Sequence, residues 1–212
     1  MQKVTCKLWD ISPPIDENAA VFPGDTAYSL RLHFELSPDC PVNVNSITLS
    51  PHTGAHADAP MHYANGGKAA GELDLTPYLG LCRVVHCIDC GPLVLPEHIA
   101  HALVDLPPRV LLRTARTASQ SWGSFTAIAQ QTIEHLATNN VALVGIDTPS
   151  VDPATSQTLP SHQQLLTHDM RVLECLVLDD VPEGDYELIA LPLKLMCADA
   201  SPVRAILREL QK

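Results

Sequence analysis

The chain has 212 residues, of which 46% are hydrophobic and 17% charged, a composition typical of a globular protein with one sizeable core. Its formal net charge is −11 and its basic residues form no cluster, which makes nucleic acid and anionic membrane surfaces poor partner candidates. No apolar run approaches the length of a membrane span, and the start MQKVTCKLWDISPP lacks the apolar region of a secretory signal. We therefore expect one domain over residues 1–212, located in the cytoplasm.

Strand-like runs of aliphatic residues alternate along the chain with segments whose apolar residues recur at helical spacing. In chain order we expect a strand at 43–50, a strand at 81–88, a helix at 97–103, a strand at 109–113, a helix at 125–138, a strand at 141–147, a helix at 162–173, and strands at 175–179 and 186–191. This alternation predicts a mixed α/β fold. No internal repeat or linker divides the chain.

The segment PHTGAHADAPMHY at residues 51–63 is unusually rich in side chains that bind metals. Its four candidates are His52, His56, Asp58 and His62. Imidazole and carboxylate groups suit a borderline metal such as zinc, and the alternative is a polar surface loop. Gly54 and Pro60 oppose a helix, whereas an extended chain would place the first three candidates on one face, with room for an ion beside Gly54. The pattern therefore favours a metal site.

Two further candidate ligands lie near the expected helix at 162–173. In TLPSHQQLLTHDM, Ser161 can cap a helix whose first residue is His162, which would place that imidazole at the end of an element, where it can face a cleft. Glu174 follows the helix at the mouth of an apolar strand, where a buried carboxylate needs a partner. That partner is either a metal ion or an arginine, with Arg171 and Arg204 available.

The seven cysteines are odd in number and scattered, which suits reduced thiols better than a disulfide framework. Only Cys87 and Cys90 form a CxxC pair. One such pair can be half of a zinc site or a redox pair. Because a strand-like run precedes it and no second pair exists, the sequence favours ordinary thiols.

Several motifs resemble those of a known family. The run HTGAHADAPMH at 52–62 is similar to the HxGTHxDxPxH signature of the cyclase-like metal hydrolases. LWDISPPI at 8–15, PGDT at 23–26, HDM and LE within 168–174, and LVLDDVPEGDYELIALPL at 176–193 narrow the resemblance to the bacterial kynurenine formamidases. The similarity runs from about Leu8 to the C-terminus. Ala55 departs from the signature, which usually has Thr there, but its side chain should point away from the ligands.

The resemblance implies a swivelling β/β/α fold with a mixed sheet and flanking helices, a homodimer, and two zinc ions per subunit, other divalent ions such as manganese being alternatives. It implies hydrolysis of N-formyl-L-kynurenine to L-kynurenine and formate in tryptophan degradation by the kynurenine pathway. The residues it assigns to the first zinc are His52, His56 and Asp58, with Asp58 shared by the second zinc, which His162 and Glu174 complete. It assigns His62 as the catalytic acid/base and places Phe22 where the family usually has a substrate-contacting Trp.

Other readings remain open at this point. His62 can instead be a further ligand, because a second nearby histidine is common in metal sites. The reaction can be that of another cyclase-family hydrolase, such as an isatin-hydrolase-like enzyme, and a non-catalytic metal-binding protein is a rival of another class. A serine-nucleophile enzyme is disfavoured, because the sequence contains no GxSxG motif.

Overall fold

The computed structural model describes residues 6–211. Its α-helices are α1 (Pro96–Ile99), α2 (Gln130–Thr138) and α3 (Pro160–Thr167). Its strands are β1 (Leu8–Asp10), β2 (Ser29–Phe34), β3 (Val44–Thr48), β4 (His56–Asp58), β5 (Leu79–His86), β6 (Leu93–Val94), β7 (Arg109–Arg113), β8 (Ala127–Ile128), β9 (Leu143–Ile146), β10 (Arg171–Glu174), β11 (Gly184–Ile189), β12 (Ala200–Pro202) and β13 (Ile206–Glu209). Among the described residues, no helix is long and apolar enough to cross a membrane.

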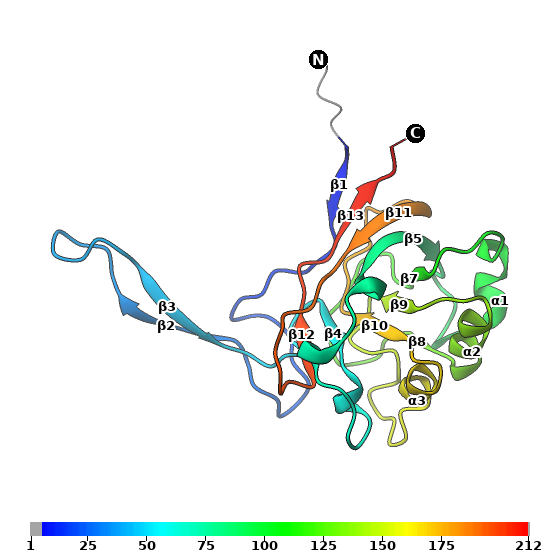
Figure 1. The fold of residues 1–212 in the computed structure, drawn as a ribbon, viewed down its shortest axis with the longest axis horizontal. Coiled ribbons are helices and arrows are strands. Elements are labelled where there is room, and N and C mark those ends of the chain that lie inside the picture. Colours follow the sequence, from blue (N-terminus) through cyan, green and yellow to red (C-terminus); the bar gives the residue numbers. More distant parts are fainter. Residues whose placement is uncertain (1–5, 212) are drawn as a thin grey trace, which may run out of the picture.

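A mixed nine-stranded sheet forms the centre of the fold, with the strand order β1-β13-β11-β5-β7-β9-β10-β4-β12 (Figure 1). The four strands β5, β7, β9 and β10 are parallel to one another, and their neighbours on both sides pair antiparallel. Helices α1, α2 and α3 lie in the connections between the parallel strands, as parallel pairing requires. The expected mixed α/β domain with flanking helices is confirmed.

The sheet is curled, and each of its faces packs against a separate apolar cluster. Along β7, Leu111 joins one cluster together with Tyr78, and both are fully buried. Its neighbours Val110 and Leu112 join the other cluster, together with Ile133 of α2. Alternate residues of a strand point to opposite faces, so these strands are apolar on both sides. A sheet buried in this way holds the side chains at its strand ends in fixed positions.

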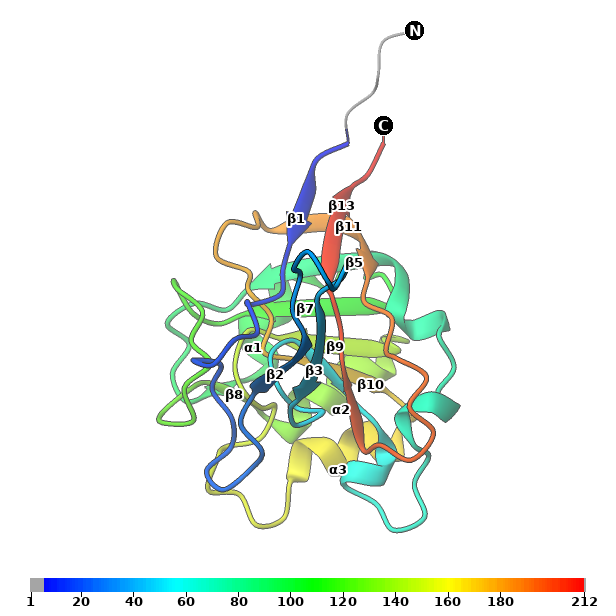
Figure 2. The same cartoon turned by 90° about the vertical axis from the view of Figure 1, so that its left-hand side faces the viewer.

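Strands β2 and β3 form a hairpin that projects away from the rest of the molecule (Figures 1 and 2). We call residues 29–48 the arm. Every residue of both strands is exposed. Leu30 lies opposite Ile47, and Leu32 lies two positions further on the same face. These three side chains are 54%, 58% and 48% exposed, so the arm has a solvent-facing apolar surface.

The structure corrects three expected elements. The helix expected at 162–173 ends at Thr167, and the chain then turns through Asp169, whose φ is +50°, into strand β10. The strand expected at 175–179 is wrong, because Cys175 has φ +58° and leaves the sheet directly after Glu174. The segment at 125–138 is likewise divided into the short strand β8 and helix α2.

Candidate active site

Strand β4 carries two of the expected metal ligands and lies beside β10, which carries a third. His56 and Asp58 alternate with Ala57, whose side chain packs in the core on the opposite face. The antiparallel register pairs Glu174 of β10 with His56. The result is a separation of 3.4 Å between His56 Nε2 and Glu174 Oε2. Glu174 therefore faces histidines; Arg171 and Arg204 pair instead with Asp169 and Asp10.

His52 reaches the same cluster from a turn, so the expected extended row of 52, 54, 56 and 58 is wrong. Gly54 has φ +68°, a conformation that favours glycine. A Cβ there would lie 2.9 Å from Ile15 Cγ1, so the glycine is required by a close contact and does not make room for an ion. The turn nevertheless places His52 Nδ1 3.0 Å from Asp58 Oδ1.

His162 lies in the first turn of α3, but it is not the first helical residue as expected, because the helix begins at Pro160 and Ser161 does not cap it. The Ser161 hydroxyl donates to the backbone oxygen of Ile128 at 2.7 Å. Asp152 takes the capping role, because its two carboxylate oxygens accept the backbone N–H groups of Ser161 and His162, both at 3.0 Å. His162 Nε2 then lies 3.3 Å from Asp58 Oδ2 and 3.6 Å from Glu174 Oε1.

The five side chains form two groups around Asp58, each compact enough to hold a cation. One group is His52, His56 and Asp58, the other is Asp58, His162 and Glu174, and the possible ligand atoms of each lie within 4.8 Å of one another. Asp58 Oδ1 faces the first pair of histidines and Oδ2 faces His162. Within residues 6–211, the buried atoms His56 Nε2 and Asp58 Oδ1 have no hydrogen-bond partner. A buried polar atom without a partner is costly, so this donor set fits a metal ion.

In each of these histidines, one ring nitrogen is held by an oxygen acceptor and the other faces Asp58. The held nitrogens are His56 Nδ1, 2.9 Å from the Gly54 carbonyl oxygen, His162 Nδ1, 2.7 Å from Asp152 Oδ2, and His52 Nε2, 3.2 Å from Asp199 Oδ2. Metal-binding histidines usually donate their second N–H to such an acceptor, which fixes the ring orientation. The three other nitrogens, His52 Nδ1, His56 Nε2 and His162 Nε2, lie 3.0, 3.3 and 3.3 Å from the Asp58 carboxylate oxygens.

The charges of the cluster also suit a cation. Burial opposes ionisation of Asp58, but the close imidazoles of His162, His52 and His56 hold its pKa well below the usual range. Burial likewise opposes a charge on His162, yet hydrogen bonds to Asp152 and Asp58 raise its pKa to about 10. The carboxylates thus hold protons on the imidazoles. A divalent cation would supply that positive charge instead and would release the protons as it bound.

His62 stands beside this cluster and outside the two groups around Asp58, but with His52 and Asp199 it forms a third, more exposed group whose atoms are close enough to hold a cation. Pro60 begins a single 3₁₀ turn, Pro60–His62, that directs the chain away from β4. The His62 ring lies 4.3 Å from that of His52 and 6.0 Å from that of His162, measured between ring centroids. Its Nδ1 lies 3.4 Å from Asp199 Oδ2. The ring is therefore close to both ligand groups while its side chain remains 34% exposed.

A pocket of about 490 Å³ opens over the cluster, and its wall includes His52, His62 and Glu174. Another part of the wall is aromatic. Phe22 and Trp122 meet there edge to face, with ring centroids 5.0 Å apart. Phe22 lies beside a Pro-Gly turn, in VFPGDT, and is 47% exposed. An apolar ring has little reason to be exposed there unless it contacts a ligand. The pocket thus joins an apolar surface suited to a ring with a polar floor of histidines and carboxylates.

Sequence reasoning missed three residues of this site: Asp152, Asp199 and Trp122. The two aspartates contact histidines that are 10 and 147 positions away, and no local pattern marks such contacts. Trp122 gave a usable signal, because it is one of only two tryptophans and lies in the polar stretch SQSWGSF. A large aromatic residue in such a loop suggests contact with a ligand or a partner.

Comparison with known proteins gives a consistent result. The family described as "Putative cyclase" matches residues 9–153. A kynurenine formamidase of Polaromonas naphthalenivorans is 78% identical over 206 residues, covering 97% of this chain and 92% of the relative. That of Bordetella pertussis is 65% identical, covering 96% of this chain and 99% of the relative.

Solved structures agree with the fold. The structure of a predicted metal-dependent hydrolase from Bacillus stearothermophilus superposes with a TM-score of 0.82 at 27% identity, covering 98% of this chain and all of that one. An isatin hydrolase bound to thioisatinate superposes with a TM-score of 0.81 at 21% identity, covering 97% of this chain and 93% of that one, which shows a shared fold alone.

The curled mixed sheet and the buried histidine–carboxylate cluster are those of a metal-dependent hydrolase. The chain belongs to the cyclase family and, within it, to the kynurenine formamidases.

Proposed function

We propose that the protein hydrolyses N-formyl-L-kynurenine to L-kynurenine and formate, a step of tryptophan degradation. The observation that carries this proposal is the 78% identity to a kynurenine formamidase over nearly the whole chain. The pocket supports it, because aromatic side chains and the polar cluster line the same space of about 490 Å³. The test is to incubate the protein with formylkynurenine and to measure the absorbance of the kynurenine formed. Isatin is assayed in parallel as the alternative substrate. Ring opening of isatin without formylkynurenine cleavage would favour an isatin hydrolase instead.

We propose that the residues around Asp58 hold two zinc ions, although another divalent ion such as manganese suits the same donors. His52, His56 and Asp58 would hold the first ion, and Asp58, His162 and Glu174 the second. When bound, the ions supply Lewis-acid chemistry, polarising the formyl carbonyl and making water more acidic. Glu174 is fixed for this task, because its Oε1 accepts the backbone N–H of Val151 at 2.7 Å.

The proposed role of His62 is proton transfer. Water attacks the formyl carbon, and the bond from that carbon to the aryl nitrogen then breaks. An arylamine anion is a poor leaving group, so the nitrogen must receive a proton as the bond breaks. His62 is placed to take the proton from the attacking water and deliver it to this nitrogen, because its ring lies within 4.3 and 6.0 Å of the His52 and His162 rings.

Phe22 and Trp122 are proposed to receive the aromatic ring of the substrate. Their edge-to-face arrangement leaves the 47% exposed Phe22 side chain in the pocket wall. Phe offers less stacking area than Trp and no indole N–H. The nearby Trp122 supplies a second aromatic surface at this position.

Replacing Phe22 with alanine is expected to raise KM about three- to tenfold with little change in kcat, because a ring contact acts mostly in binding. Phe22→Trp should restore or lower KM. Steady-state kinetics with formylkynurenine measure both values. If Phe22→Ala keeps its KM but lowers the thermal midpoint, Phe22 only packs its turn, and the pocket assignment is wrong.

We propose that the protein is a homodimer and that the arm contributes to the contact. An isolated two-stranded hairpin is marginally stable in water, and exposed apolar surfaces of this kind usually mark interaction sites. Leu30, Leu32 and Ile47 form one such surface. On the opposite face, Ser46 is polar, paired with Arg31 and hydrogen-bonded to His33 at 2.8 Å.

Leu32→Lys should therefore shift the protein toward the monomer, because it places a charge in the apolar face of the arm. Ser46→Lys adds the same charge to the other face of the arm and should leave the dimer intact. Light scattering coupled to gel filtration gives both masses. A monomeric wild type, or a Leu32→Lys variant that stays dimeric, would contradict the proposal.

A cytoplasmic location is also proposed. Its support is that all seven cysteines are free, as expected of a protein kept in a reducing compartment. Cell fractionation with an antibody against the protein tests this location.

A further inference from the structure

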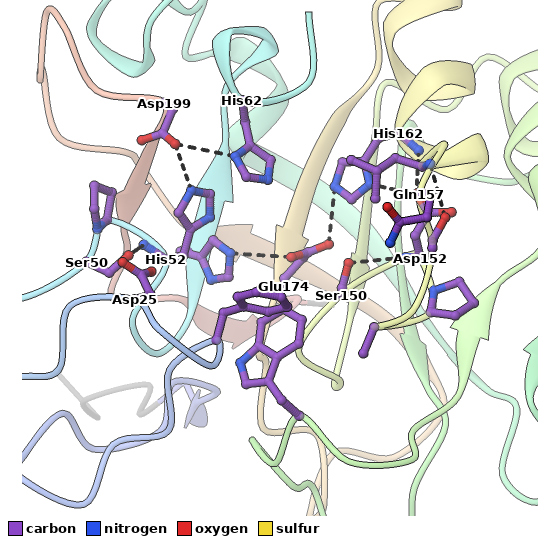
Figure 3. Close-up of a pocket in the computed structure, with 18 residues that line it drawn as sticks. Asp25, Ser50, His52, His62, Ser150, Asp152, Gln157, His162, Glu174 and Asp199 are labelled. Atoms are coloured by element: carbon purple, nitrogen blue, oxygen red, sulfur yellow. Dashed lines mark hydrogen bonds and ion pairs between the residues drawn. The ribbon is translucent and has the colours of Figure 1, made fainter.

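One carboxylate oxygen of Asp199 contacts two histidines that have different proposed tasks. Asp199 Oδ2 lies 3.2 Å from Nε2 of His52, a proposed metal ligand, and 3.4 Å from Nδ1 of His62, the proposed acid/base (Figure 3). Both nitrogens can donate to it only as N–H groups. Two such N–H donations would leave His52 Nδ1 and His62 Nε2 free for other partners.

Backbone hydrogen bonds of one buried residue, Ala59, hold both Asp199 and His62 in place. The N–H of Ala59 donates to the backbone oxygen of Asp199, and the carbonyl of Ala59 accepts the N–H of His62, both at 2.9 Å. Ala59 is fully buried, and the next residue pair, Ala200 and Asp58, is held in the β12–β4 ladder. The backbones of Asp199 and His62 are thus anchored to the same residue, Ala59, directly beside the ligand strand.

We propose that Asp199 is a positioning residue that fixes His62 relative to the metal ligands. Its carboxylate holds the His62 ring in the tautomer with hydrogen on Nδ1, so that Nε2 takes the proton from water and passes it to the leaving nitrogen. The same oxygen orients His52 toward Asp58. This inference rests on the proposed function for His62, but the ring tautomer and the hold on His52 are properties of the folded protein alone.

Asp199 differs from the ligands around Asp58 in its surroundings. Its side chain is 42% exposed, whereas those of Asp58 and His56 are each 1% exposed. His52 already directs Nδ1 to Asp58 at 3.0 Å, so its Nε2 is the nitrogen left to donate outward. An acceptor for that outward N–H is the usual partner of a metal-binding histidine.

The test is a double-mutant cycle of Asp199→Ala and His62→Ala in zinc-loaded protein. Asp199→Ala should lower kcat about 10- to 100-fold, the usual effect of losing such a partner, with KM changed less than about threefold. If Asp199 acts through His62, adding Asp199→Ala to His62→Ala should cost less than about a further threefold. Asp199→Asn, which keeps an acceptor oxygen, should retain more activity than Asp199→Ala.

Two readouts need no substrate. A nitrogen-15 spectrum of histidine side chains should show His62 with hydrogen on Nδ1 in the wild type and a mixture of tautomers in Asp199→Ala. Asp199→Ala should also lose one zinc ion to a chelator about 10- to 100-fold more readily. The control is Glu183→Ala, which removes a 40% exposed carboxylate 3.2 Å from His101, outside the pocket, and should change none of these values.

Losses that multiply in the double variant, or an unchanged His62 tautomer, would overturn the proposal. If the wild type fails to cleave formylkynurenine while the tautomer and the chelator results are as expected, the proposed function fails and the positioning role stands.

Discussion

Replacing Asp58 with alanine is expected to leave the protein with neither metal ion. Asp58 is the one residue common to both ligand groups, with Oδ1 facing His52 and His56 and Oδ2 facing His162. Its removal takes a carboxylate from each group at once. Without the Lewis-acid chemistry of the ions, turnover should fall by about four orders of magnitude or more, because bulk water is a far weaker acid than metal-bound water.

Elemental analysis after dialysis measures this effect, with two ions per chain expected for the wild type. His162→Ala is the matched comparison, because it touches only the second group and should remove mainly the second ion. Circular dichroism shows whether each variant remains folded. A fully active wild type with one ion per chain would contradict the binuclear proposal.

Replacing His62 with alanine should lower kcat by about two to four orders of magnitude while both ions stay bound, the range usual for a lost acid/base. The reason is the position of His62, which lies in a turn beyond Pro60 and outside the two groups around Asp58. Kinetics and metal analysis on the same preparation separate the two effects.

The control for His62 is His168→Ala, which removes an exposed histidine that follows α3 and does not line the pocket. It should leave both kcat and metal content unchanged. A His62→Ala variant that loses zinc would show that His62 is a ligand, and the proposed proton transfer would then need another group.

The sequence predicted those helices and strands whose apolar residues recur at the spacing of that element. The strand at 109–113 has the expected bounds, because its run RVLLR is apolar enough to be buried on both faces. The prediction of a single helix over 162–173 was wrong, because the apolar spacing of this segment also fits a helix followed by a strand. What separates the two is the parallel pairing of β10 with β9, a contact that sequence spacing does not contain.

The residues of the candidate site were likewise predicted only in part. The three candidate ligands at 52, 56 and 58 were visible because they lie close together in sequence, even though the chain brings His52 in by a turn instead of a strand. Asp152 and Asp199 could not be predicted, since each acts as the hydrogen-bond partner of a histidine in another element. Such partners are fixed only once the strands have paired.

The pairing of β4 with β10 has a thermodynamic consequence for folding. Asp58 and His162 lie 104 positions apart in sequence, so the unfolded chain cannot present both to one ion. Each ion that binds only the native arrangement adds to the free energy of unfolding in proportion to the logarithm of its concentration over its dissociation constant. Metal supply and conformational stability would then be linked: ions bound to this cluster would join distant segments of the chain much as a covalent cross-link does, but reversibly.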